Sequence, residues 1–158
     1  MRFSGERQVR TSVEHVWAAL HDREVLRAAI PGCEDLVPLE AGRYAATLAA
    51  RVGPVADTYR GAFSIEDLCA LSELRVRVEG LGRFGRLELD LHVNLTSGRW
   101  PGATALRYDA HTTVSGFVAR LGNATLVVAG NHLTGCFFRE LDRSLHPGAR
   151  RTSAATLA

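Results

Sequence analysis

The feature that most constrains the fold is a long amphipathic helix at residues 121–145, which follows a series of short segments with strand periodicity. Apolar residues recur three and four positions apart on one face of this helix: Leu126, Val127, Leu133, Phe137, Leu141 and Leu145. The apolar face needs a surface to cover, and the sheet that precedes it in the chain offers one. Because a long helix across a curved sheet can leave a cavity between the two, this order of elements predicts a container for a ligand.

The chain of 158 residues fits one domain and is long enough to bury a core without metals or disulfides. We expect this domain to cover residues 1–145 and a short, polar, flexible tail to occupy residues 146–158. The net charge of +2 includes 19 arginines and no lysine. These arginines are spread along the chain, so the sequence does not indicate nucleic-acid binding.

The beginning of the chain lacks the apolar core of a signal peptide, and no segment is apolar for long enough to span a bilayer. We therefore expect a cytoplasmic protein and leave open peripheral contact with the inner face of the membrane. The three cysteines, Cys33, Cys69 and Cys136, lie far apart without CxxC spacing, which is typical of reduced thiols.

Alternating residues and turn signals predict an α+β fold in which six strands form an antiparallel meander and a further strand lies at the start of the chain. The expected strands are residues 3–10, 34–40, 43–52, 57–67, 72–80, 85–96 and 103–115. Two short helices, residues 13–20 and 23–29, follow the first strand. The first begins after the N-cap candidates Thr11 and Ser12, and the second ends before Pro31.

Strand alternation assigns one set of side chains to the concave face of this sheet. Together with the apolar face of the long helix, it predicts a cavity lined by Tyr44, Leu48, Tyr59, Gly61, Phe63, Val76, Leu89, Leu91, Tyr108, Ala110, Thr112, Leu126, Leu133 and Phe137. The three phenols and the threonine hydroxyl could orient an apolar ligand. A packed core with tyrosines at its rim accounts for the same pattern, and both interpretations stay open.

A ligand would enter where loops and helix ends meet, because these can move without breaking the sheet. The residues predicted at this mouth are Ile30, Pro31, Gly32, Val55, Phe117 and Leu121. Nearby glycines, including Gly53 and Gly116, would give the mouth the backbone freedom to open.

The hairpin between residues 72–80 and 85–96 carries charges that predict its register. A tip at residues 81–84 sets three opposite-charge pairs across the outer face: Glu79 with Arg86, Arg77 with Glu88, and Arg75 with Asp90. Residues 80–85 also match GxGxxG, but an alternating strand follows them where a nucleotide-binding loop would open a helix.

No histidine has metal-ligand spacing, and no GxSxG motif is present. We therefore expect no catalytic residues, no metal and no cofactor. The sequence favours a binding protein over an enzyme.

Several motifs together are typical of one family: Val16-Trp17-x-x-Leu20-x-Asp22, Ile30-Pro31-Gly32-Cys33-Glu34-x-Leu36, Val52-Gly53-Pro54-Val55, Tyr59-x-Gly61, Gly116-Phe117-Val118-Ala119-x-Leu121-Gly122 and Phe137-Phe138-x-x-Leu141. On these motifs the chain resembles the carbon monoxide dehydrogenase G-subunit family of the START-like (SRPBCC, helix-grip) superfamily. The resemblance implies a seven-stranded sheet around the C-terminal helix and an elongated apolar cavity. It also implies a non-enzymatic role beside a molybdenum hydroxylase that family members associate with the membrane.

The expected ligand is therefore an apolar small molecule such as a lipid or a quinone, and the expected partner is a molybdenum hydroxylase. Two alternatives remain: an adaptor without a ligand, and a cyclase or hydrolase with Tyr44, Tyr59 or Tyr108 as proton donor. A homodimer and transient membrane contact also remain open. Because the tail from residue 146 is short and polar, stable anchoring by this chain alone is not expected.

Overall fold

A computed structural model describes residues 1–146 of the chain, and the predicted tail from residue 147 onward lies outside them. The elements are β1 (Arg2–Val9), α1 (Val13–Leu20), α2 (Arg23–Ala29), β2 (Cys33–Pro38), β3 (Arg43–Val52), β4 (Val55–Cys69), β5 (Glu73–Leu81), β6 (Arg86–Ser97), β7 (Thr104–Ser115), the 3₁₀ helix η1 (Phe117–Leu121) and α3 (Asn123–Leu145). The α+β class and the two short helices after the first strand are confirmed. The long helix begins two residues later than predicted, since η1 occupies the residues before it.

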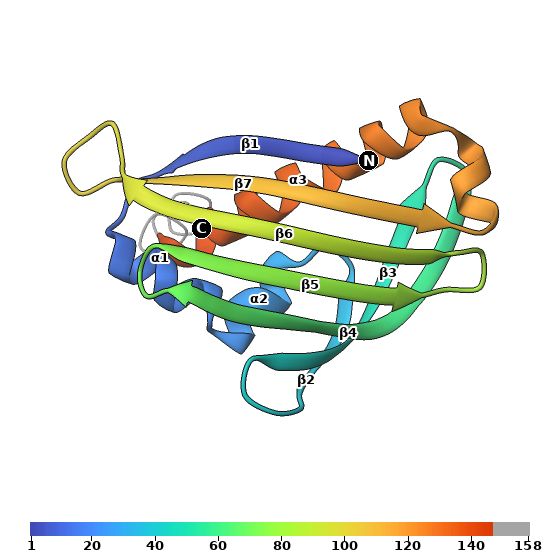
Figure 1. Cartoon of the computed structure of the whole chain (residues 1–158), viewed down its shortest axis with the longest axis horizontal. Coiled ribbons are helices and arrows are strands. Elements are labelled where there is room, and N and C mark those ends of the chain that lie inside the picture. Colours follow the sequence, from blue (N-terminus) through green and yellow to red (C-terminus); the bar gives the residue numbers. More distant parts are fainter. Residues whose placement is uncertain (147–158) are drawn as a thin grey trace, which may run out of the picture.

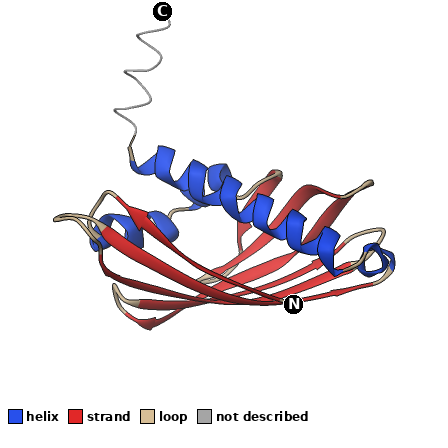
Figure 2. Cartoon of the chain, turned by 90° about the horizontal axis from the view of Figure 1, so that it is seen from above, coloured by secondary structure: helices blue, strands red, loops and turns tan. Residues whose placement is uncertain are grey.

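The seven strands form one antiparallel sheet in the order β1-β7-β6-β5-β4-β3-β2 (Figure 1). Strands β2 to β7 make the predicted meander, and β1 returns to pair with β7. The helix α3 crosses one face of the curved sheet, with α1 and α2 beside it at one end (Figure 2). This is the predicted helix-grip arrangement.

Local signals set the ends of the short helices. The Ser12 hydroxyl accepts the His15 N–H at 3.2 Å and caps α1. Asp22 caps α2 in the same way, accepting the Glu24 N–H at 2.9 Å. At the other end of α2, Ile30 takes an extended conformation because it precedes Pro31.

The packed core lies at the end of the sheet that α1 and α2 cover. Its main cluster joins β1, α1, the central strands and the C-terminal half of α3 through Val9, Val16, Ala19, Leu20, Leu74, Val93, Leu95, Leu106 and Leu141. A smaller cluster of Leu26, Leu36 and Phe63 lies between α2, β2 and β4. Burial of apolar surface therefore concentrates in one half of the molecule.

The register predicted for β5 and β6 is wrong by two positions. Glu79 lies opposite Glu88 instead of Arg86, so the predicted ladder of charge pairs does not form. One predicted charge pair does form, although its residues are not directly opposite each other: Arg75 Nε donates to Asp90 Oδ1 at 2.9 Å.

The turn between these strands explains the difference. It consists of residues 82–85, closed by the Gly82 N–H to the Gly85 carbonyl at 2.8 Å. The Asp57 carboxylate of β4 accepts backbone N–H groups from this turn and fixes its position. This tertiary contact outweighs exposed charge pairs, each of which contributes only about 0.2–1 kcal/mol.

Two glycines of α3 have different surroundings. A Cβ placed on Gly130 would lie 2.5 Å from the Phe3 ring of β1, so the missing side chain makes room for an aromatic neighbour. A Cβ on Gly135 would meet nothing within 4 Å. Close packing therefore requires glycine at the first position and leaves the second free to change.

The two positions predict opposite results for alanine substitution. Gly135→Ala should raise the free energy of unfolding by up to about 1 kcal/mol, because alanine has the higher helix propensity. Gly130→Ala should lower it, because the added methyl group displaces Phe3. Urea denaturation measures both, and equal effects would contradict this account of α3.

Two leucines of β5 make a matched test of the core. Leu74 is 2% exposed and Leu81 is 63% exposed. Leu74→Ala should cost about 2–5 kcal/mol of unfolding free energy, since it leaves a cavity in the main cluster. Leu81→Ala should change it by less than about 0.5 kcal/mol. Similar losses at both positions would show that the core does not lie where the structure places it.

Candidate functional site

The concave face of the sheet carries the residues predicted to line a cavity. Cross-strand pairs align them in rows, one of which runs through Tyr44, Phe63, Val78, Leu89 and Thr112. A second row contains Ile65, Val76, Leu91, Ala110 and Phe3. The predicted residues of the five strands β3 to β7 therefore share one face, and α3 supplies Leu126, Leu133 and Phe137.

These residues divide into a packed group and an open group. Phe63 and Ala110 are buried, and other members pack against the two core clusters: Tyr44, Val76, Leu91, Tyr108 and Phe137. Five members belong to neither cluster and stay partly exposed: Leu48, Tyr59, Leu89, Thr112 and Leu133. Leu126 is buried near the start of α3.

Three members of the open group lie toward the end of the sheet away from α1 and α2, whereas Leu48 pairs with Cys33, shortly after the end of α2. Tyr59 is near the start of β4, Leu89 is near the start of β6, and Thr112 is near the end of β7. These strand ends meet at the β3–β4 turn, the β5–β6 turn and η1 (Figure 1). Apolar side chains on the concave face thus remain accessible at one end of the molecule.

Two turns approach the helical segment at this end. A Cβ on Gly53 would lie 3.0 Å from Thr125 Cγ2, which places the β3–β4 turn against the first turn of α3. The Val118 N–H of η1 donates to the Phe84 carbonyl at 2.9 Å. The rings of Phe84 and Phe117 lie 6.2 Å apart, and 37% and 52% of these residues are exposed.

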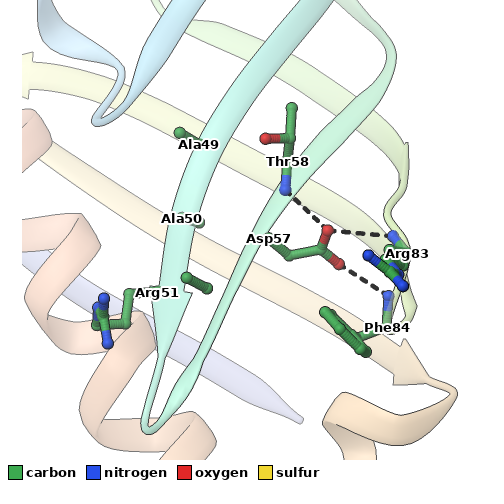
Figure 3. Close-up of a pocket in the computed structure, with 8 residues that line it drawn as sticks. Ala49, Ala50, Arg51, Asp57, Thr58, Arg83 and Phe84 are labelled. Carbon is green, nitrogen blue, oxygen red and sulfur yellow. Dashed lines mark hydrogen bonds between the residues drawn. The ribbon is translucent and has the colours of Figure 1, made fainter.

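A hollow of about 700 Å³ opens between the β3–β4 hairpin and the β5–β6 turn (Figure 3). Its lining consists of Ala49, Ala50, Arg51, Ala56, Asp57, Thr58, Arg83 and Phe84. None of the residues predicted for the cavity borders it. The hollow lies at the accessible end of the sheet and is more polar than the predicted site.

Asp57 is a residue of this hollow that the sequence patterns did not single out. Its Oδ1 accepts the N–H groups of Thr58 at 2.8 Å and Arg83 at 3.1 Å, and its Oδ2 accepts that of Phe84 at 2.9 Å (Figure 3). A charged residue in phase with Tyr59 and Gly61 on an apolar strand face was the available signal. Its carboxylate fastens the β5–β6 turn to β4.

The pKa of Asp57 reflects these contacts. Partial burial raises the pKa of the carboxyl group, but the three backbone donors and the charge of Arg83 outweigh this effect. The pKa therefore lies below its ordinary value. Asp57 remains ionised at neutral pH and acts as a structural acceptor.

The three tyrosines do not converge on one point. Tyr44 stacks on Phe63 in the smaller cluster, with ring centroids 5.0 Å apart. Tyr108 lies 5.4 Å from Phe138 in the main cluster. Tyr59 alone belongs to the open group, where burial and then the charge of Asp57 raise the pKa of its phenol. Of the three, Tyr59 is the phenol best placed to meet a ligand at the open end.

Glycines at the predicted site have structural roles that sequence alone did not reveal. A Cβ on Gly61 would lie 1.7 Å from the Glu79 carbonyl oxygen, so this glycine permits close strand contact and adds no free space. Gly32 has φ +72° and lies against the Ala49 carbonyl. Gly116 has φ +86°. The positive φ values of Gly32 and Gly116 favour glycine, so both residues form defined turns.

The model of the family described as the carbon monoxide dehydrogenase G subunit (CoxG) matches residues 5–146. The chain belongs to this family. Among curated protein sequences, no relative was found.

Solved structures support the same fold for this CoxG family member. A conserved protein from Geobacillus kaustophilus is similar, with 24% identity, a TM-score of 0.88, and coverage of 93% of this chain and 96% of that one. A START superfamily protein from Mycobacterium smegmatis has 9% identity and a TM-score of 0.69, with 92% and 97% covered. The Zhui aromatase/cyclase from Streptomyces sp. R1128 has 16% identity and a TM-score of 0.64, with 98% and 97% covered. The START-like fold is thereby confirmed.

Within residues 1–146, no helix combines the length and the apolar character needed to cross a membrane.

Substitution of Asp57 tests its role at the open end. Asp57→Asn should speed amide hydrogen exchange by about tenfold or more at one of Arg83 and Phe84, because their N–H groups bond to different oxygens of Asp57 and asparagine keeps only one acceptor oxygen. Since the folded pKa is lowered, the wild-type contact is fully present above about pH 3.9 and is lost as the pH falls through the folded pKa.

Asp35→Asn, at an exposed position of β2, is the control and should leave exchange at this turn unchanged. Unaltered exchange in Asp57→Asn would show that the turn is held by other contacts.

Proposed function

We propose that this CoxG family member binds an apolar small molecule, a lipid or a quinone, between the concave face of the sheet and α3. The observation that carries the proposal is the open group, whose apolar side chains lie on the ligand-facing side of the sheet but belong to neither core cluster. A ligand that buries this accessible apolar surface would bind favourably through the hydrophobic effect. The packed half of the sheet would limit how deeply the ligand enters.

Polar groups beside this surface suit a quinone. The raised pKa of Tyr59 keeps its phenol protonated, so the hydroxyl can donate a hydrogen bond to a quinone carbonyl. Thr112, on the same face, supplies a second hydroxyl. A ring held by Tyr59 could leave its apolar tail along Leu89 and Leu133, with Thr112 opposite Leu89 as a polar group further along the same face.

We propose a non-enzymatic role. Asp57, the carboxylate nearest to Tyr59 in β4, is occupied by backbone donors and has a lowered pKa, which makes it a poor general base. The family name supports association with a carbon monoxide dehydrogenase, a molybdenum hydroxylase, and redox chemistry would then belong to that partner.

A cytoplasmic protein that exchanges such a ligand would meet the inner face of the membrane transiently. Phe84 and Phe117 are exposed at the open end, and Arg83 and Arg120 are close to them in sequence. Aromatic side chains with neighbouring cations suit the interface of an anionic bilayer. The adaptor alternative has less support, since an adaptor would need an exposed apolar patch, and Ile30, Pro31 and Val55, which are apolar residues of the predicted mouth, are half-buried.

Organic-solvent extraction of the purified protein followed by mass spectrometry tests the proposal directly. A lipid or quinone in near-stoichiometric amount is the expected result. A protein that is empty, does not bind added menaquinone, and still co-purifies with a molybdenum hydroxylase would support the adaptor instead. Turnover of an added substrate by the protein alone would support an enzyme.

Leu89 offers a matched substitution for the site. Leu89→Trp should weaken quinone binding by about tenfold or more, because the larger ring occupies the open half of the concave face. Asn94→Trp places the same ring on the opposite face of β6 and should leave binding unchanged. Quenching of tryptophan fluorescence by a soluble ubiquinone analogue gives the affinities. Equal affinities in both folded variants would place the ligand elsewhere.

A further inference from the structure

A second hollow lies between β1 and the C-terminal half of α3, in the half of the molecule that carries the packed core. It has a volume of about 430 Å³. The N-terminal side of its lining consists of Arg7, Gln8, Val9 and Arg10, and the helical side consists of Gly135, Phe138, Arg139, Leu141 and Asp142. We call this hollow the β1 groove.

The β1 groove follows the free edge of the sheet. Residues 7–10 are consecutive, and successive side chains of a strand point to opposite faces, so a hollow that touches all four runs along the backbone edge. Strand β1 is an edge strand of the sheet and pairs only with β7 among the described residues. Its outer edge can therefore accept another extended chain.

The groove is basic. It contains Arg7, Arg10 and Arg139, none of which takes part in the ion pairs found among residues 1–146. Its one carboxylate, Asp142, is 3.6 Å from His146. The lining thus carries a local excess of positive charge.

Aromatic rings hold two of these arginines in place. The guanidinium carbon of Arg7 lies 5.2 Å from the centre of the Phe138 ring, and that of Arg10 lies 5.4 Å from the centre of the Trp100 ring. A guanidinium group stacked on a ring keeps its N–H edge free to bind a carboxylate. The arginines are therefore positioned before a partner arrives.

We infer that the β1 groove binds an extended acidic segment of a partner protein, which adds to β1 as a further strand and places its carboxylates on Arg7, Arg10 and Arg139. Backbone groups of β1 would pair with the segment, and the arginines would select for aspartate and glutamate. A strand edge offers regularly spaced N–H and C=O groups, which suit a polypeptide better than a lipid headgroup. This inference does not depend on the ligand proposed above.

Fluorescence anisotropy with a fluorescein-labelled hexaglutamate peptide tests the inference at low salt. The double variant Arg7→Gln, Arg139→Gln should bind this probe about tenfold or more weakly, since each arginine loses a charge-assisted contact. The matched control Arg60→Gln, Arg77→Gln removes the same charge from the opposite face of the sheet and should stay within about twofold of wild type.

Gly135 provides a second variant that does not disturb Phe138. Because a Cβ at this position meets nothing within 4 Å, Gly135→Glu should extend a carboxylate into the groove and compete with the probe. Gly135→Gln, of the same size, should weaken binding less. Methylation of alternate backbone nitrogens in the probe should also weaken binding, because strand addition needs those N–H groups.

Three results with the peptide probe would overturn the inference: no binding of the probe to wild type, equal losses in both arginine double variants, or equal binding of the methylated and unmethylated probes. Phosphatidylglycerol vesicles distinguish a membrane site. If vesicle binding, and not peptide binding, falls in the Arg7→Gln, Arg139→Gln variant, the groove is a lipid contact and the inference is wrong.

Discussion

The contact between α3 and the concave face of the sheet is the one on which the rest of the structure depends. A 23-residue helix with an apolar stripe is stable in water only when that stripe is covered, and a curved sheet is its cover here. The same contact determines where side chains are packed and where they are not. Helices α1 and α2 fill the space beside α3 at one end, and within residues 1–146 no comparable element fills it at the other.

The two ends therefore have different properties. At the end near α1, leucines and valines from helices and strands bury one another almost completely. At the end near η1, apolar residues of the same strands stay partly accessible to solvent. This end of the concave face is bordered by turns between strands, whereas α1 and α2 cover the other end. One domain can thus combine a stable core with an accessible apolar surface whose burial by a ligand would favour binding.

Features that depend on neighbouring residues could be predicted from the sequence. The helix caps, the extended residue before Pro31, the strand periodicity and the order of the meander all follow from local patterns, and the structure has them. The family motifs, too, are local. They indicate the family whose model matches residues 5–146.

Features that depend on contacts between distant residues could not be predicted. The β5–β6 register follows from Asp57, which lies 26 residues before Arg83. The need for glycine at position 61 follows from the approach of β5, and the division of the cavity residues follows from where α1 and α2 pack. The β1 groove joins the first and last elements of the domain, so no window of sequence contains it.

The pairing of β1 with β7 has a consequence for biosynthesis. It places Arg2 opposite His111, so Arg2 has no cross-strand partner until more than a hundred further residues have been translated. Strands β3 to β7 can each pair with the strand made just before, because short turns join them. We therefore expect the sheet to grow from β2 toward β7 during translation and β1 to join late. During that interval β1 has both edges open, which makes this strand the part of the nascent chain most in need of protection.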